Sequence, residues 1–149
     1  MVTTARRAFL KVLDAPAVEA AIRQAEAGTT GEIRVSIAGY FRGDPRRLAE
    51  RAFRRLGMDA TRNRNGVLIL VAPSRRQVVV LGDAGIHRHV GHPYWQRVAT
   101  ELATAMRANQ ANQGLLHAIA TVGDELARHF PAGTAPNANE LPDTIDLPR

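Results

Sequence analysis

Cysteine is absent from this 149-residue chain, which excludes disulfide bonds, thiolate nucleophiles and thiolate metal ligands. Aromatic residues make up only 5% of the sequence, so the stacking platforms typical of proteins that bind single-stranded nucleic acid are scarce. No stretch reaches the roughly 18 consecutive apolar residues of a membrane span, and the first residues hold no apolar run of signal-peptide length. We therefore expect a soluble, cytoplasmic protein without a membrane span.

Serine is also rare, and neither Ser36 nor Ser74 lies in the G-x-S-x-G motif that presents a serine nucleophile. A phosphate-binding loop of the usual type needs glycines followed by lysine and Ser or Thr, and the single lysine, Lys11, lies in no such loop. These absences leave metal-assisted hydrolysis as the one enzyme chemistry that the residues support.

The charge balance is basic, with a net charge of +6, and all but one of the 20 basic residues are arginine. Arginine pairs well with phosphate and carboxylate, so the charge favours weak, non-specific attraction for anions. A nucleic-acid-binding motif is missing, and we expect no specific nucleic-acid partner. The sequence neither identifies nor excludes a protein partner.

Two apolar, β-branched runs at residues 66–72 and 77–81 predict neighbouring strands. The polar residues 73–76 between them form a turn so short that the two strands pair as an antiparallel hairpin. Alternation in residues 32–37 predicts another strand, with one wetter face, near a sheet edge. A helix between this strand and the next implies that the two are parallel. The side chains expected to be buried in the hairpin are Val67, Ile69, Val71, Val78 and Val80.

Apolar residues recur at helical spacing in four segments. The first expected helix starts at Asp14 and Pro16 and ends at Gly28, and the second starts at Asp44 and Pro45 and ends at Gly57. The third opens at Pro93, and the fourth runs from after Gly114 to Pro131.

These elements predict a single α/β/α sandwich with a mixed central sheet, in which a β-α-β crossover is followed by an antiparallel hairpin and two C-terminal helices. The length suits one domain. We place that domain at residues 15–131, after an N-terminal arm at 1–14 and before a flexible C-terminal tail at 132–149. Because the tail has no amphipathic period, we expect its removal to cost little stability.

Four ordered motifs carry a family resemblance: TGEIRV from residue 30, LGMDATRNRNGVLILVAPSRR from residue 56, GDAGIH from residue 82 and ELARHFP from residue 125. Over residues 15–131 the chain resembles the compact bacterial members of the TPM domain family, which also includes thylakoid-lumen proteins implicated in photosystem II repair. The resemblance implies an α/β/α sandwich. Some relatives are described as acid phosphatases, and some bind a divalent cation such as calcium.

Asp83 is the first candidate for a metal ligand, and two roles compete for it. Its carboxylate and the adjacent loop carbonyls are the oxygen ligands that calcium prefers, while Gly82 and Gly85 let the backbone approach closely. A short aspartate after a strand also commonly caps the next turn. Glu32 matches the acidic residue that opens the first strand in the family, and Asp59 lies in the loop before Asn65, where the family varies. The two would complete a divalent-cation site with Asp83 if their loops converge.

Three histidines, His87, His89 and His92, lie close together in the sequence and present a weaker candidate for a zinc site. Established zinc motifs place two ligands on one helix face or pair cysteines, and neither arrangement occurs here. We expect no organic cofactor.

Two functions follow from these residues. The first is a binding or assembly module with a divalent-cation site. The alternative, which rests mainly on the resemblance, is a metal-assisted acid phosphatase-like hydrolase of phosphomonoesters. In that reading Asp83 and Glu32 hold the cation, and Arg75 or Arg76 neutralises the phosphate.

Overall fold

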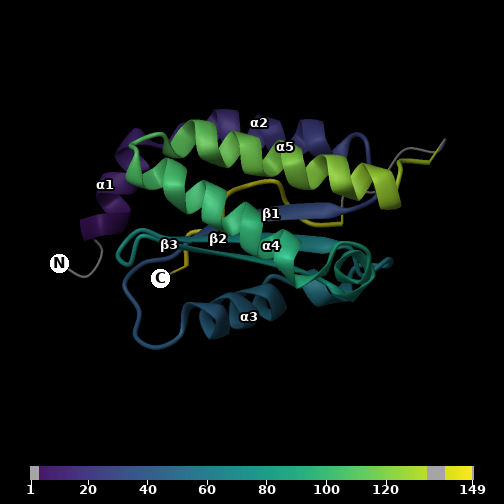
Figure 1. The fold of residues 1–149 in the computed structure, drawn as a ribbon, viewed down its shortest axis with the longest axis horizontal. Coiled ribbons are helices and arrows are strands. Elements are labelled where there is room, and N and C mark those ends of the chain that lie inside the picture. Colours follow the sequence, from purple (N-terminus) through teal and green to yellow (C-terminus); the bar gives the residue numbers. More distant parts are fainter. Residues whose placement is uncertain (1–3, 134–139, 149) are drawn as a thin grey trace.

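The computed structural model describes residues 4–133 and 140–148. A three-stranded sheet forms the middle layer, with α2, α4 and α5 on one face and α3 on the other (Figure 1). This layering confirms the predicted α/β/α architecture. In chain order the elements are α1 (Thr4–Val12), α2 (Ala15–Glu26), β1 (Glu32–Ile37), α3 (Pro45–Arg55), the 3-10 turn η1 (Met58–Ala60), β2 (Gly66–Ala72), β3 (Gln77–Gly82), α4 (Ala84–Arg107) and α5 (Ala111–His129).

The strand order is β1-β2-β3, so that β2 is central and the other two are edges. β1 pairs with β2 in parallel, with Glu32 opposite Gly66. β2 pairs with β3 antiparallel, with Val67 opposite Gly82. Both pairings are as the sequence predicts, because a helical crossover joins the parallel pair and a four-residue turn joins the antiparallel pair.

Alternation along the strands gives the sheet two apolar faces. One face packs odd-numbered residues such as Ile33, Val35 and Ile69 against α2, α4 and α5. The opposite face packs Leu68 and Leu70 against α3 and Met58. Of the five hairpin residues expected inside, Val78 is only half-buried and the others are buried: Val67, Ile69, Val71 and Val80.

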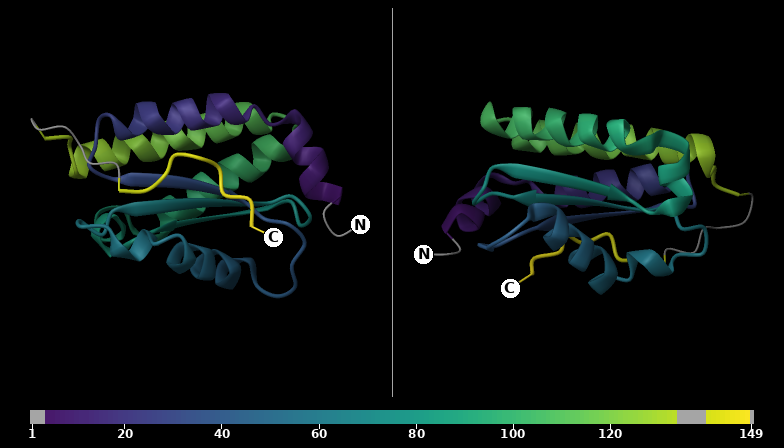
Figure 2. Two further views of the ribbon diagram at one scale, coloured as in Figure 1. Left: turned by 180° about the vertical axis from the view of Figure 1, so that it is seen from behind. Right: turned by 60° about the horizontal axis from the view of Figure 1, so that its bottom comes forward.

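The helix expected to open at Pro93 begins nine residues earlier, at Ala84, so the segment taken for a loop is helical. Gly91 interrupts it with φ 76° and ψ 168°, a conformation that only glycine adopts readily. A glycine and a proline two residues apart usually mark the end of a helix, which is why the sequence pattern places the start of this helix too late. The helix therefore consists of two arms joined at Gly91, the second of which runs along the sheet (Figure 2).

β1 has no wetter face, contrary to expectation, because all six of its residues are buried. The C-terminal segment covers its outer edge: Ile37 N donates to Asp146 O at 2.9 Å, and Asp146 N donates to Val35 O at 2.8 Å. The left panel of Figure 2 shows this yellow segment beside β1.

Residues 140–148, which belong to the predicted flexible tail, thus include a backbone pairing with β1. Backbone pairing to a strand edge needs no apolar period, so the composition of the tail gives no sign of it. Residues 134–139 and 149, which belong to the same predicted tail, lie outside the described residues. Within the described ranges, no helix combines the length and apolar character needed to cross a membrane.

Candidate functional site

The polar residues that the sequence singles out meet at one end of the sheet, where β1 and β2 begin and β3 ends. Glu32 lies opposite Gly66 in β1, and Asp83 N donates to Gly66 O at 2.9 Å from the other side. Glu32 and Asp83 are thus two strand spacings apart, about 10 Å. The strand register directs both side chains to the sheet face that α3 covers.

Asp83 is almost buried, and its carboxylate is fully engaged. Arg64 Nε donates to Oδ2 at 2.6 Å and Arg64 Nη2 donates to Oδ1 at 2.8 Å, while Ala84 N donates to Oδ1 at 2.8 Å. The first two bonds form a bidentate ion pair, and the third caps the N-terminus of α4. The hydrogen bonds and charge of Asp83 raise the pKa of the Arg64 guanidinium. Capping, one of the two roles expected for Asp83, is therefore present.

The loop before β2 holds Arg64 in place. Arg64 has φ 50°, in the left-handed region, and its carbonyl accepts a hydrogen bond from Gly85 N at 2.8 Å. A Cβ on Gly85 would lie 2.6 Å from that carbonyl, so the close approach requires glycine. Asn63 and Asn65 each donate a side-chain hydrogen bond of 3.2 Å to Thr30 Oγ1. The loop is thus tied both to α4 and to Thr30, two residues before β1.

Asp59 lies in η1 and is exposed, and its negative charge contributes to the raised pKa of Arg64, after the larger contributions from Asp83. Asp83 pairs directly with Arg64, and Asp59 acts on the same guanidinium through its charge alone. Asn65 follows Arg64 in the chain, and its buried side-chain oxygen Oδ1 has no hydrogen-bond partner among the described residues. Carboxylate and amide oxygens of this kind fit a hard cation such as calcium, and Asp83 and Asp59 are the side chains that would hold it.

Glu32 belongs to a different cluster. It is 3% exposed, and its Oε1 accepts a hydrogen bond from Leu141 N at 2.7 Å. Burial is the largest cause that raises its pKa, to about 7, and the charges of Glu140 and Asp143 act in the same direction. A hydrogen bond from the C-terminal segment thus engages Glu32, the side chain that was expected to share a cation with Asp83.

Glu26, at the end of α2, is the second carboxyl group of this cluster. Its Oε2 accepts a hydrogen bond from Ile33 N at 2.8 Å. Burial and a hydrogen bond with Asp143 raise its pKa to about 9. At neutral pH this side chain is therefore a neutral carboxylic acid.

The three predicted metal ligands are therefore not gathered at one point: Asp83 pairs with Arg64, Glu32 lies with Glu26, and Asp59 is exposed in η1. Across residues 4–133 and 140–148, no three histidine or acidic side chains gather closely enough to form a metal cluster. Sequence reasoning missed Arg64 and Glu26, because an unusual φ angle and a contact between α2 and the C-terminal segment leave no local signal.

The histidines diverge instead of converging. His87 Nδ1 accepts a hydrogen bond from Trp95 Nε1 at 3.0 Å, while His89 stacks on His129 with 4.2 Å between ring centroids. His92 is exposed and lies 3.5 Å from Gln96 Nε2. Each ring therefore has a separate environment.

The arginines expected to neutralise a phosphate at Asp83 lie at the wrong end of the sheet. Arg75 and Arg76 are in the hairpin turn, and the six residues of β3 separate them from Asp83 by about 20 Å. Arg75 instead donates to Phe41 O at 3.2 Å and lies over the ring of Phe41. The sequence suggested that these arginines lie near Asp83 because few residues separate them along the chain. Those residues form an extended strand, which keeps the two groups far apart.

Comparison with known proteins gives a family and two similar solved structures. The model of the TPM domain family matches residues 4–125. The solution structure of the BA42 protein from the psychrophilic bacterium Bizionia argentinensis is 35% identical, with a TM-score of 0.82, over 90% of this chain and 92% of that one. The N-terminal domain of a protein from P. gingivalis is 16% identical, with a TM-score of 0.64, over 76% of each chain, and shares the fold. No curated protein matches the chain.

Proposed function

Because this chain belongs to the TPM domain family, we propose that it acts as a binding or assembly module in which a divalent cation such as calcium competes with Arg64 for the Asp83 carboxylate. The observation that supports this proposal is the bidentate pair between Arg64 and Asp83 at the end of the sheet. The carboxylate is 7% exposed, while the arginine side chain is 53% exposed. The Asp83 carboxylate is therefore held in place, while the more exposed guanidinium of Arg64 can be replaced by another cation.

The surroundings of this pair favour exchange of one cation for another. The charge of Asp59 acts on Arg64, and Asp59 would supply a second carboxylate. The cap to Ala84 N uses only Oδ1, so a cation that replaces Arg64 leaves Asp83 attached to α4. Exchange of the guanidinium for a metal ion would free Arg64 to pair with an acidic group of a partner. The module would then present a different surface in its two states.

Calorimetric titration with calcium tests the proposal. We expect the wild type to bind calcium, Asp83→Asn to lose binding, and Arg64→Gln to bind severalfold more tightly because the competing guanidinium is gone. Arg62→Gln is the matched control, since it removes the same charge from the same loop at a side chain that does not contact Asp83. Calcium affinity that is equal in Arg64→Gln and Arg62→Gln would disprove competition, and equal affinity in wild type and Asp83→Asn would disprove the site.

One observation favours the alternative, a metal-assisted hydrolase of phosphomonoesters. The pKa of Glu32, raised by burial to about 7, suits a group that transfers protons near neutral pH. The same burial weighs against this role, because Leu141 and its neighbours cover the carboxyl group. Turnover of p-nitrophenyl phosphate that requires a divalent cation and is abolished in both Glu32→Gln and Asp83→Asn would establish the hydrolase and overturn the non-enzymatic proposal.

A further inference from the structure

Among the described residues no segment pairs with the outer edge of β3, unlike the outer edge of β1. Asp83 N bonds Gly66 O, and the antiparallel register then makes Leu81 and Val79 the residues that hydrogen-bond to β2. The N–H and C=O groups of Val78 and Val80 consequently point away from the sheet. Within the described ranges these groups have no other backbone partner.

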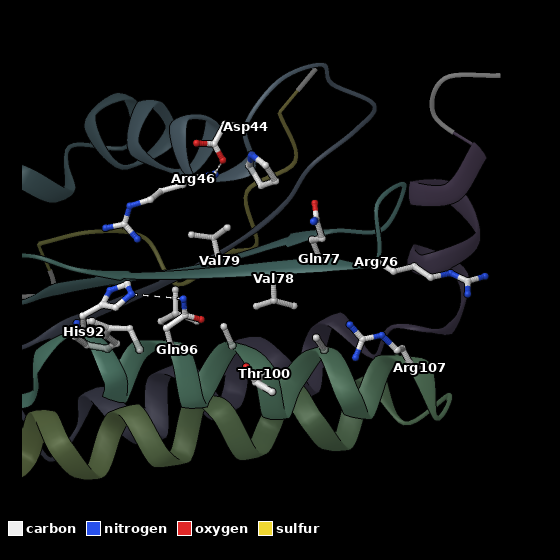
Figure 3. A pocket seen from close by; sticks show the side chains of 15 residues that line it. Asp44, Arg46, Arg76, Gln77, Val78, Val79, His92, Gln96, Thr100 and Arg107 are labelled. Carbon is white, nitrogen blue, oxygen red and sulfur yellow. Dashed lines mark hydrogen bonds between the residues drawn. The ribbon is translucent and has the colours of Figure 1, made fainter.

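A groove of about 380 Å³ runs beside this edge (Figure 3). The start of α3 forms one wall and the second arm of α4 forms the other, so the strand edge lies at the bottom between them. Val78, Val80 and Ala99 give the groove an apolar interior. At the Gly82 end Trp95 packs directly on the strand, since a Cβ on Gly82 would lie 2.7 Å from Trp95 Cη2. The strand edge, the start of α3 and the second arm of α4 thus line one groove, and Trp95 lies at its Gly82 end.

The rim of the groove is basic. Figure 3 shows Arg76 and Arg107 at one end, and Arg46 and His92 approaching from opposite walls at the other. Arg76 and Arg107 are exposed, and among the described residues neither has an ionic partner. Arg46 has only a long contact of 3.6 Å with Glu50.

Among the described residues that line the groove, the one acidic side chain, Asp44, already accepts a hydrogen bond. Asp44 Oδ1 accepts a hydrogen bond from Arg46 N at 3.1 Å and so caps α3. Positive charge at both ends of an apolar groove fits a segment with acidic ends and an apolar middle.

The other edge of the same sheet shows how this fold holds an extended acidic segment. At β1 the chain's own Asp146 makes two backbone hydrogen bonds to the strand. Its side chain accepts hydrogen bonds of 2.8 Å from both Arg55 Nη2 and Ser36 Oγ. Backbone pairing combined with an arginine clamp is the arrangement that the β3 groove offers to a second segment.

We propose that the β3 groove binds an extended acidic peptide of a partner protein by β-strand addition to Val78–Val80. Backbone pairing with the open edge supplies the affinity, and the arginines at the two ends select the acidic residues. A second copy of this chain fits less well, because edge-to-edge pairing would bring two basic rims together. The inference is independent of the cation proposal, since the groove and Asp83 involve different side chains.

NMR titration with a synthetic peptide tests the inference. The probe is acetyl-Glu-Glu-Val-Thr-Val-Glu-Glu-amide, and the two control peptides replace every Glu by Lys or carry N-methyl groups on both valines and the threonine. We expect the acidic probe to shift the amide signals of Val78 and Val80 and to slow their hydrogen exchange. The Lys peptide should bind at least tenfold more weakly, and the N-methylated peptide should lose binding because the central amides of both its edges can no longer donate hydrogen bonds. Equal binding of all three peptides would disprove strand addition.

Variants locate the site and separate it from the cation proposal. Arg76→Glu with Arg107→Glu should weaken the acidic probe at least tenfold, whereas Arg23→Glu with Arg54→Glu, the same charge change outside the groove, should not. Val78→Pro removes an outward N–H without breaking a bond to β2 and should abolish binding while thermal unfolding confirms the fold. Binding should persist with EDTA and in Asp83→Asn, and its loss there would place the peptide at the other end of the sheet. Sedimentation that shows a wild-type dimer dispersed by Val78→Pro would identify a second copy as the occupant and overturn the proposal.

Discussion

At the scale of single residues, Glu26 makes the folded chain sensitive to alkaline pH. Burial and the hydrogen bond with Asp143 raise its pKa to about 9, and Glu32 titrates nearby with a pKa of about 7. In the unfolded chain both groups ionise near the ordinary carboxyl value, about 4.3. Between that value and their folded pKa values, the folded state holds protons that the unfolded state lacks. The free energy of unfolding therefore falls as pH rises through this window.

Glu26→Gln tests this linkage between about pH 7 and 9, where Glu26 is the group of the pair still titrating. Gln keeps an oxygen for Ile33 N and a donor for Asp143, but it cannot ionise. Urea unfolding across this range should show stability falling with pH in the wild type, by at most about 1.4 kcal/mol per pH unit for one proton, and a flatter profile in the variant. Glu50→Gln, an i,i+4 partner of Arg46 on α3, should retain the wild-type slope. Identical slopes in Glu26→Gln and wild type would show that Glu26 ionises normally.

The same scale shows how far the sequence alone predicts the candidate site. Asp83 and Gly85 were found because a carboxylate between glycines after a strand is a local pattern. Arg64 was not, because its role depends on a left-handed φ that brings the loop back over α4. Glu32 was placed at the correct strand end, yet its actual neighbours come from the C-terminal segment, more than 100 residues away. Long-range contacts of this kind have no sequence period.

At the scale of elements, Gly91 divides α4 into two arms and sets the wall of the β3 groove. Its φ of 76° and ψ of 168° lie in a region essentially restricted to glycine. Gly57, after α3, has nearly the same φ, 74°, but a ψ of 19°, which is the left-handed helical conformation that asparagine tolerates. The two glycines thus differ mainly in ψ.

We predict that Gly91→Asn destabilises the protein by about 1–3 kcal/mol, the usual cost of a side chain in such a conformation. Gly57→Asn should cost clearly less, because asparagine is common at this position after helices. A Cβ at either glycine meets little, so backbone strain and not crowding decides the difference. Chemical denaturation of both variants measures it. Equal losses would mean that ψ at Gly91 is not what fixes the bend.

The elements themselves were largely predictable, with one instructive failure. The strands, the hairpin and the capped starts of α2 and α3 follow from residue period and from Asp14 and Asp44, which accept the expected capping hydrogen bonds. The start of α4 was misplaced because Gly91 and Pro93 normally end a helix. Here they reorient one, and nothing local distinguishes the two outcomes.

At the scale of the whole molecule, the two edges of the sheet differ in whether another segment of the chain pairs with them. Asp146 pairs with the outer edge of β1, whereas no described segment pairs with the outer edge of β3, which lies between two walls that carry arginines. An exposed strand edge is an aggregation risk that proteins usually limit with charge, and the arginines around β3 serve that purpose whether or not a partner is bound. The C-terminal segment therefore has a structural task that its composition does not reveal.

Deletion of the C-terminal segment tests whether it stabilises the fold. Deletion of residues 140–149 uncovers β1, breaks the hydrogen bonds of Asp146 with Val35 and Ile37, and exposes Glu32. We predict that the midpoint of thermal unfolding falls by more than about 5 °C, which for this size corresponds to more than about 1 kcal/mol. Asp146→Asn, which keeps the backbone bonds and weakens the contacts with Arg55 and Ser36, should cost less.

The acid dependence of these variants separates the side chain from the backbone. Burial alone would raise the pKa of Asp146, but the hydrogen bonds from Arg55 and Ser36 outweigh it and hold the pKa below the ordinary value. A carboxyl group with a lowered folded pKa stabilises the protein above its unfolded pKa, and that contribution is lost as pH falls through the folded pKa. The difference between wild type and Asp146→Asn should therefore shrink in acid, while part of the deletion's effect persists because backbone pairing does not titrate. A deletion that leaves the unfolding midpoint unchanged at neutral pH would show that the segment rests on β1 without stabilising it.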